Sequence, residues 1–199
     1  MEQIIQQSKQ KKHWDNNLIM KNNIIFFLIF FTTTLVADER TIKLDRLFND
    51  LKINNSSIGF EIEQKIWKMW STHPYDNKLT NMLADGSDLV NNQKLYQAID
   101  IFSKVIELDP NWAEGWNKRA TVLYMMGNFE LSQNDIDMVL SLEKRHFGAL
   151  SGQGLVQTAL QNYQKAIDSY IEAHKIYPSS QSTLQMIEQL NILIQKESI

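Results

Sequence analysis

Cysteine is absent from the 199-residue chain. Its absence excludes disulfide staples, cysteine zinc sites, iron–sulfur ligation, a cysteine nucleophile and a lipidated N-terminal cysteine. Glycine and proline are also scarce. The 199 residues include seven glycines and three prolines, well below the average usage of roughly 7% and 5% of residues. We therefore expect few tight turns and long helices.

An excess of positive charge is also lacking. The formal net charge is −3 and the pI is about 5.8, whereas a nucleic-acid-binding protein usually carries a basic face. No nucleic-acid partner is therefore expected. Hydrophobic residues make up 43% of the chain and charged residues 22%, which is sufficient for one domain or two small ones.

An apolar run lies near the N-terminus. Residues 24–31 are all apolar, Lys21 precedes them, and the run continues through three threonines to Ala37. A basic flank, a short apolar core and a small exit residue are typical of a secretory signal peptide. A membrane-spanning helix needs about 20 apolar residues. The stretch 24–37 is shorter, so the pattern favours a cleaved signal over an uncleaved membrane anchor or a buried helix.

This interpretation predicts cleavage after Ala37 and a location in the periplasm or cell envelope. If residues 24–37 were retained, they would associate with a membrane instead. The polar residues 1–19 show no pattern. Translation that starts at Met20 explains them more simply than a start at Met1 with a long cytoplasmic n-region.

The rest of the chain repeats itself every 34 residues. The repeats are residues 79–112, 113–146 and 147–180. Small residues recur at two positions of each repeat, as Gly86 with Ala98, Ala120 with Ser132 and Gly154 with Ala166. Such residues let two helices cross closely, and large apolar residues nearby fill the space beside the crossing. Pro110 and Pro178 cannot continue a helix, so they end their repeats.

This pattern resembles the tetratricopeptide repeat (TPR), which combines W-x2-L-G-x2-Y, A-x3-F and P over 34 residues. The matching residues are Trp116, Ala98, Phe102, Pro110, Gly154, Ala166, Tyr170 and Pro178. The middle repeat departs from the pattern at Ser132 and Lys144. The resemblance implies an all-α fold, a right-handed superhelical solenoid of helix–turn–helix repeats. Residues 116–121 and 145–152 also look like those of exported bacterial TPR proteins, which implies an envelope location.

Further helices flank the repeats. Residues 38–78 are expected to form an N-terminal helical pair and linker, and residues 181–199 a C-terminal capping helix. The capping helix would bury a stripe at helical spacing, which consists of Leu184, Ile187, Leu190 and Ile194. Turns are expected near residues 91–93, 127–128 and 161–162. Asn111, followed by Glu114, matches a capping box.

No constellation of catalytic or metal-binding residues is recognisable. His73, His146 and His174 lack metal-ligand spacing, so we expect surface or capping roles for them. Glycines 152 and 154 lack the third glycine of a phosphate loop and lie within an expected helix. The tryptophans at 67, 70 and 112 are expected in the core. We therefore expect a protein that is not an enzyme, and nominate no catalytic residue, no metal ligand and no cofactor.

The resemblance places the functional surface on the concave side of the solenoid. The residues predicted to line a peptide-binding groove are Leu83, Ser87, Val90, Asn117, Thr121, Tyr124, Met125, Ser151, Leu155 and Thr158. The same register places Glu114 there as the only charged residue. Such a nearly neutral lining suits an extended or helical peptide with apolar anchors. The grip on a peptide carboxylate by Lys, Arg and Asn that some family members use is not expected.

The sequence therefore predicts a scaffold or adaptor that binds a partner protein or peptide. Some apolar lining residues could instead pack under the N-terminal pair or the C-terminal helix. One alternative function is a membrane-anchored assembly subunit of an envelope complex, which would retain residues 24–37. Another is a hydrolase, which would need a clustered polar pocket.

Overall fold

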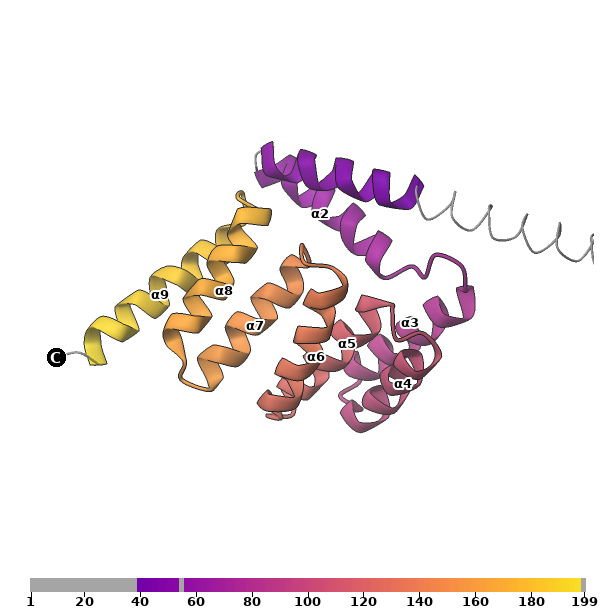
Figure 1. The fold of residues 1–199 in the computed structure, drawn as a ribbon. Helices are drawn as coiled ribbons and strands as arrows, with labels where there is room; N and C mark the ends of the chain where they lie inside the picture. The colour runs from indigo at the N-terminus through magenta and orange to yellow at the C-terminus, as the bar shows by residue number, and fades with distance from the viewer. Residues whose placement is uncertain (1–38, 54–55, 198–199) are drawn as a thin grey trace, which may run out of the picture. The chain divides into compact units, whose positions relative to one another are not determined.

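The structure is a computed structural model that describes residues 39–53 and 56–197 (Figure 1). The chain divides into two compact units, Met1–Asp45 and Arg46–Ile199. The described part of the first unit, residues 39–45, is helical. The predicted signal peptide and start at Met20 lie outside the described residues. No helix within the described ranges is long and apolar enough to cross a membrane.

The second unit is a succession of helices, and its described residues include no strand. Residues 46–53 continue the first helix, and α2 (Ser56–Trp70) follows. The remaining helices are α3 (Asn77–Asn91), α4 (Leu95–Leu108), α5 (Ala113–Met125), α6 (Phe129–Leu142), α7 (Phe147–Ala159), α8 (Tyr163–Ile176) and α9 (Gln181–Glu197). The predicted all-α class is therefore confirmed. The turns within the three pairs fall at residues 92–94, 126–128 and 160–162, where the sequence placed them.

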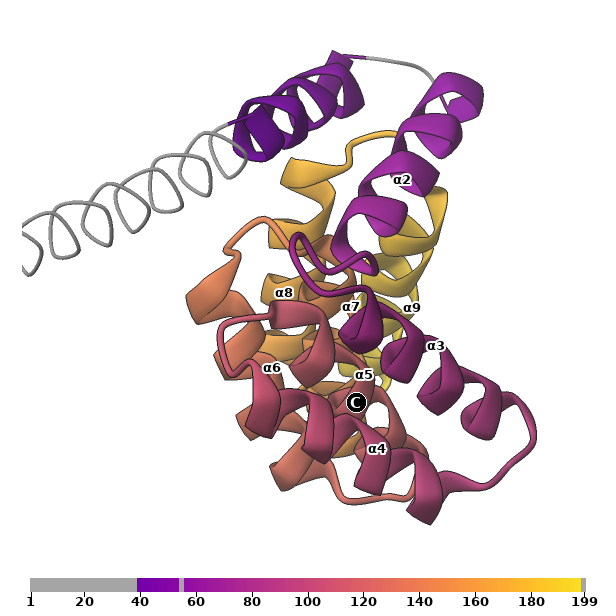
Figure 2. The same ribbon diagram turned by 90° about the vertical axis from the view of Figure 1, so that its right-hand side faces the viewer.

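The helices from α3 to α9 stack in chain order, each packed against the next, as the side view and the end-on view show together (Figure 1 and Figure 2). The first helices of neighbouring repeats also touch, α3 with α5 and α5 with α7. Small residues sit at the crossings within each pair. A Cβ added at Gly86 would overlap the Phe102 ring, and one at Gly154 would overlap the Tyr170 ring. At the middle crossing, Ser132 Oγ donates a hydrogen bond to the backbone oxygen of Ala120 at 2.8 Å.

The turn inside each pair contains one residue with a left-handed backbone. These residues are Gln93 (φ 59°), Gly127 (φ 77°) and Gln161 (φ 61°), and they occupy the same position of the three repeats. Only Gly127 adopts this conformation without a steric penalty from a Cβ atom. The following backbone N–H bonds back into the preceding helix, for example from Asn128 to Leu123 at 2.9 Å, which closes the helix end.

The predicted capping box is wrong. The residue at the start of α5 is Trp112, with no side-chain hydrogen bond to the helix. The backbone N–H of Asn111 instead donates to Asp109 Oδ1 at 2.9 Å. Glu114 does not turn back to the cap because its carboxylate is buried and bonded to Asn117 of α5 and to His146, the residue that caps α7.

Helix α9 packs against α8 as a terminal helix. Leu190 is buried there with Ala166, Ile167 and Tyr170, while Met186, Ile187 and Ile194 pack around this cluster. Leu184 differs from the prediction, because 40% of its side chain is exposed. In the first turn of α9 the buried residue is instead Thr183, which bonds to the backbone oxygen of Ser180 at 3.0 Å.

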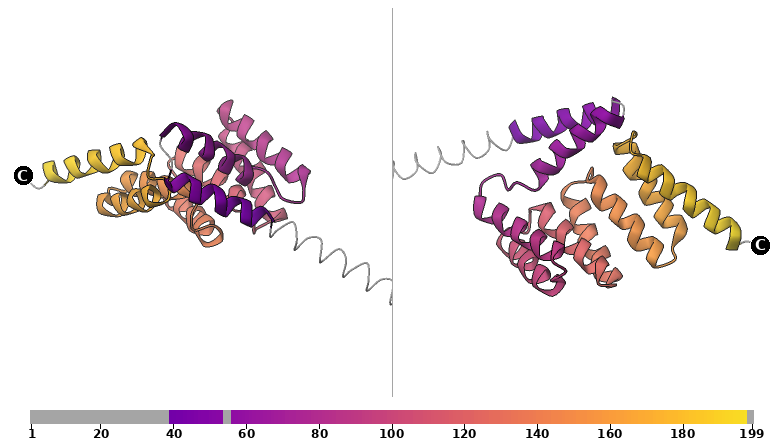
Figure 3. Two further views of the ribbon diagram at one scale, coloured as in Figure 1. Left: turned by 90° about the horizontal axis from the view of Figure 1, so that it is seen from above. Right: turned by 180° about the vertical axis from the view of Figure 1, so that it is seen from behind.

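Helix α2 runs past the turns that join successive repeats (Figure 3). At the first turn, Trp112 Nε1 donates to the backbone oxygen of Trp70 at 2.9 Å. At the second, the Trp70 ring stacks on His146, with ring centroids 3.9 Å apart. At the third, a Cβ added to Gly59 would lie 3.2 Å from the Tyr177 ring. One helix outside the repeats therefore contacts all three turns.

Candidate functional site

A small cleft opens between α5 and α7. Its volume is about 60 Å³. Its lining residues are Asn117, Ala120, Thr121, Tyr124, Ser132, Ile136, Gly148, Ala149, Gly152 and Leu155. Four of the predicted groove residues therefore meet at one place. They come from the first helices of the second and third repeats.

Polar groups at this cleft are partly engaged within the protein. Asn117 is only 7% exposed, and its Nδ2 donates to Glu114 Oε2 at 3.2 Å. Thr121 is exposed, and its hydroxyl donates to the backbone oxygen of Asn117 at 3.0 Å. The Thr121 oxygen keeps lone pairs that can accept a hydrogen bond from a ligand.

Apolar area surrounds these polar groups. Tyr124 is half-buried, and the centroid of its ring lies 5.6 Å from that of the Phe129 ring. Leu155 lies across the cleft and is 39% exposed, and Met125, beside Tyr124 in the chain, is 50% exposed. The site therefore presents partly covered apolar side chains next to a few hydrogen-bonding groups.

The other predicted groove residues lie elsewhere. The prediction that Leu83 lines the groove is wrong, because this residue is 2% exposed and belongs to the core cluster of the first repeat. Val90 packs against that same cluster. Ser87 and Thr158 are half-buried and donate to backbone oxygens of their own helices, at 2.9 and 2.7 Å. Ser151 lines a different cavity, described below.

Glu114 also departs from the prediction. It was placed on the groove as a charged group, but it is 1% exposed. His146 Nε2 lies 3.1 Å from its Oε2, and Lys118 Nζ lies 3.4 Å from its Oε1. Oε1 has this ion-pair contact but no hydrogen-bond partner among the described residues. Because the carboxylate is buried, it adds no charge to the surface of the cleft.

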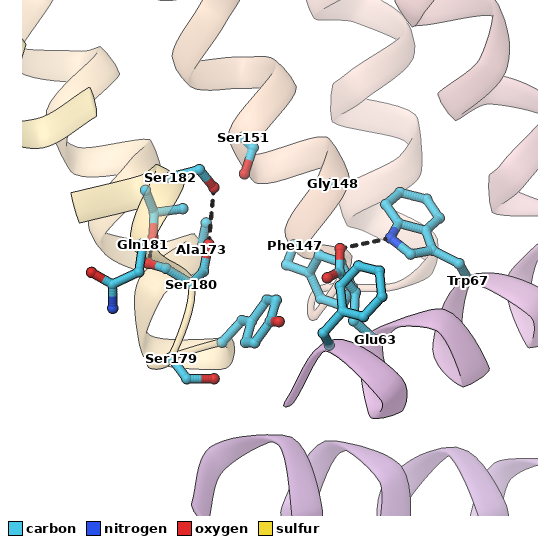
Figure 4. Close-up of a pocket in the computed structure, with 13 residues that line it drawn as sticks. Glu63, Trp67, Phe147, Gly148, Ser151, Ala173, Ser179, Ser180, Gln181 and Ser182 are labelled. Carbon is cyan, nitrogen blue, oxygen red and sulfur yellow. Dashed lines mark hydrogen bonds between the residues drawn. The ribbon is translucent and has the colours of Figure 1, made fainter. Parts of the chain in front are cut away.

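A larger cavity of about 430 Å³ lies between α2, the start of α7 and the turn from α8 to α9 (Figure 4). Its lining residues are Phe60, Glu63, Trp67, Phe147, Gly148, Ser151, Ala173, Tyr177, Ser179, Ser180, Gln181, Ser182 and Thr183. Gly148 of α7 lines both this cavity and the cleft. Burial and the neighbouring Glu63 carboxylate raise the pKa of Tyr177 above its usual value.

The sequence identified only Ser151 of this larger cavity. Its walls join residues 60–67 to residues 147–151 and 173–183, which are far apart in the chain and share no repeat spacing.

A third cavity of about 410 Å³ lies beside Arg119 and Asp135. The guanidinium donates twice to the carboxylate, from Nε to Oδ2 at 2.7 Å and from Nη2 to Oδ1 at 2.8 Å. Arg119 also donates from Nη1 to Ser103 at 3.1 Å. The guanidinium of Arg119 and the carboxylate of Asp135 are therefore paired with each other, and the pair links α5 to α6.

The histidines act within the fold. His146 accepts a hydrogen bond from the backbone N–H of Ala149 at 3.1 Å and caps α7. Capping is one of the two roles that the sequence predicted for the histidines. His73 Nε2 bonds to Asp109 Oδ2 at 2.8 Å, and its Nδ1 accepts from the backbone of Asp76 at 2.9 Å. In the described part of the chain, no three His, Asp or Glu residues are grouped so that they could hold a metal ion.

Comparison with known proteins finds no family profile that matches the chain. A TPR repeat-containing protein of Rhizobium etli is 34% identical over 160 residues, which cover 77% of this chain and 74% of that protein.

Solved structures agree on the fold. The first TPR domain of Spaghetti (RPAP3), bound to the HSP90 peptide SRMEEVD, is 19% identical with a TM-score of 0.58. That match covers 60% of this chain and 94% of the other. The TPR2B domain of yeast Sti1, in a complex with Hsp70, is 16% identical with a TM-score of 0.57, covering 59% of this chain and 99% of the other. The repeat register, the stacked helical pairs and the Rhizobium relative together show that the chain belongs to the TPR repeat-containing proteins.

Proposed function

We propose that this chain is a protein-interaction scaffold that binds an extended or helical segment of a partner protein across α5 and α7. The observation that carries the proposal is the cleft in which Tyr124 and Leu155 offer apolar area beside Thr121. The TPR domain of RPAP3 is bound to an HSP90 peptide and that of Sti1 is in a complex with Hsp70, which supports the same mode of action. No catalytic step is part of the proposal.

The ligand we propose differs from the acidic peptide bound by RPAP3. No Lys or Arg is among the described residues that line the cleft, and Asn117 is already bonded to Glu114. A grip on a terminal carboxylate would need such cations. Apolar anchors held by shape and a few hydrogen bonds fit the lining better, and their binding depends weakly on salt.

The experiment starts with affinity capture of partners by the full chain and identification by mass spectrometry. The captured partner is then titrated against the wild type and Tyr124→Ala at two salt concentrations. We expect the variant to lose about 1–3 kcal/mol of binding free energy because an anchor contact is removed.

Tyr96→Ala is the matched control, since Tyr96 is 77% exposed on α4 and lines neither hollow. Equal affinities for wild type and Tyr124→Ala would contradict the proposed surface, as would a steep loss of binding with salt. A broad hydrolase screen of the same preparation tests the rival function.

We also propose that the protein works in the bacterial cell envelope. The support is the apolar run 24–37, with Lys21 before it and Ala37 at its end. The mass of the native N-terminus decides between the two envelope forms. A terminus at or near Asp38 in a soluble fraction supports export, whereas intact residues 20–37 in the membrane fraction support the anchored assembly subunit.

A further inference from the structure

We propose that the larger cavity, beside the cleft, binds a basic side chain of the partner segment, with arginine preferred over lysine. The inference rests on the proposed function, because the same partner segment would occupy both hollows, which share Gly148 as a lining residue. It adds a chemical requirement that the nearly neutral cleft does not impose.

The first support is the carboxylate of Glu63. This side chain is half-buried on α2 and accepts a hydrogen bond from Trp67 Nε1 at 3.1 Å (Figure 4). No Lys or Arg among the described residues forms an ion pair with it. Its other neighbour, Tyr177, is a neutral phenol whose pKa it helps to raise. The negative charge of Glu63 is therefore hydrogen-bonded but not neutralised.

The second support is the set of aromatic rings around this charge. Phe60 is 57% exposed at the edge of the cavity, and Trp67 is half-buried beside Glu63. A cation over an aromatic face is attracted by the ring quadrupole, most strongly over tryptophan. A planar guanidinium can also stack on such rings while it bonds to a carboxylate, which is the reason for preferring arginine.

The helix ends at the cavity do not reverse this preference. The C-terminal end of α8 and the N-terminal end of α9 meet in the same turn. Their partial charges, about half an elementary charge each, have opposite sign and offset one another. At the start of α7, the N–H of Ala149 is already bonded to His146. The full charge of Glu63 therefore decides the sign of the ligand.

Size and polar groups also fit a long side chain. The volume of about 430 Å³ lies within the range of about 300–1,000 Å³ that is common for ligand pockets. Ser151 of α7 and Ser182 of α9 lie on the walls opposite α2 (Figure 4). Their hydroxyl oxygens can accept hydrogen bonds from guanidinium N–H groups.

The test uses the full chain and two probes, N-acetylarginine amide and its neutral isostere N-acetylcitrulline amide. Binding is followed by the indole N–H signal of Trp67 in nitrogen-labelled protein, assigned with Trp67→Phe. We expect the arginine probe to shift this signal and to bind about tenfold more tightly than the citrulline probe, a difference of about 1.4 kcal/mol. Glu63→Gln keeps the acceptor for Trp67 but removes the charge, so it should abolish the preference.

Glu61→Gln is the matched control, because Glu61 is exposed on the same helix and does not line the cavity. It should retain the preference. Equal binding of both probes to the wild type, or an unchanged preference in Glu63→Gln with an unchanged melting curve, would overturn the proposal. So would a stronger shift with N-acetylglutamate amide, which would assign the cavity to an anion.

The two proposals fail separately. If the captured partner loses affinity with Tyr124→Ala but not with Glu63→Gln, the cleft stands and the basic-side-chain site falls. If the amide probes discriminate as expected while Tyr124→Ala changes nothing, the cavity stands and the cleft does not bind the partner.

Discussion

His146 and Glu114 form a buried pair that joins the N-terminal end of α7 to the first turn of α5, with Nε2 and Oε2 3.1 Å apart. His146 Nδ1 accepts a hydrogen bond from the backbone of Ala149, so the ring proton is on Nε2 and points at the carboxylate. One face of the ring stacks on Trp70. A single side chain thus caps α7, donates to one oxygen of a buried carboxylate and packs against Trp70 of α2.

Replacing His146 by Phe should test this combination. The ring shape is largely kept, but Glu114 loses a hydrogen bond and the N–H of Ala149 loses its acceptor. We expect the free energy of unfolding to fall by about 2–4 kcal/mol, since buried groups are left unsatisfied. Urea unfolding measures the loss. His174→Phe, at a half-buried histidine with one long contact of 3.3 Å to Thr183, should cost much less; equal losses would contradict the role of His146.

The two buried tryptophans at the first inter-repeat turn allow a matched comparison. Both are 7% exposed. Trp112 Nε1 donates to the backbone oxygen of Trp70, whereas Trp70 Nε1 is buried with no hydrogen-bond partner among the described residues. Trp112→Phe should therefore destabilise the protein by about 1 kcal/mol more than Trp70→Phe. The denaturant midpoints of the two variants measure this difference in stability. The reverse order would contradict the hydrogen bond that joins Trp112 to α2.

The repeat architecture could be predicted because its determinants are local. Gly154 of α7 and Tyr170 of α8 lie in consecutive helices joined by one turn. The small residue and the ring that covers it therefore appear at a fixed spacing within the repeat. The turns at residues 92–94, 126–128 and 160–162 carry the same periodic signal. Helix crossings and turn backbones leave such signals in any single sequence.

The larger cavity and the role of Glu114 could not be predicted for the opposite reason. Glu63 and Trp67 meet Gly148 and Tyr177 only because α2 lies along the inter-repeat turns, and no period links these positions. The family register counts Glu114 as a lining residue, but His146 32 residues later turns it inward. The prediction that Leu83 lines the groove was wrong for a similar reason. The register assigns the direction in which its side chain points, whereas packing in the first repeat determines that the side chain is buried.

Overpacking one helix crossing should test the register of the third repeat. Ala166 is fully buried where α8 packs under α9. Ala166→Trp should destabilise the fold by about 1–3 kcal/mol because no space is available for the indole. Thermal unfolding followed by circular dichroism checks this. Lys165→Trp, on the exposed side of the same helix, is the control, and an Ala166→Trp melting curve like that of wild type would count against the register.

Tyr170 should make the protein sensitive to alkali. Its hydroxyl is buried without a hydrogen-bond partner in the described part of the chain, and burial, with a smaller contribution from Tyr124, raises its pKa from 10.0 to about 12. Below pH 10 the phenol is protonated in both the folded and the unfolded protein, so its contribution to stability does not change with pH. Above pH 10 the unfolded chain releases the proton first, and the free energy of unfolding falls until the pH passes the folded pKa.

The full loss corresponds to about 3 kcal/mol, because each pKa unit is about 1.4 kcal/mol. Urea unfolding of wild type and Tyr170→Phe across this alkaline range isolates the effect. The variant lacks the titrating group and keeps the ring that fills the space beside Gly154, so its stability should decline less steeply with pH. The other titratable groups are present in both proteins, so the difference between the two pH profiles reports on the Tyr170 phenol. Parallel pH profiles for the two proteins would show that the buried phenol of Tyr170 is not the group responsible.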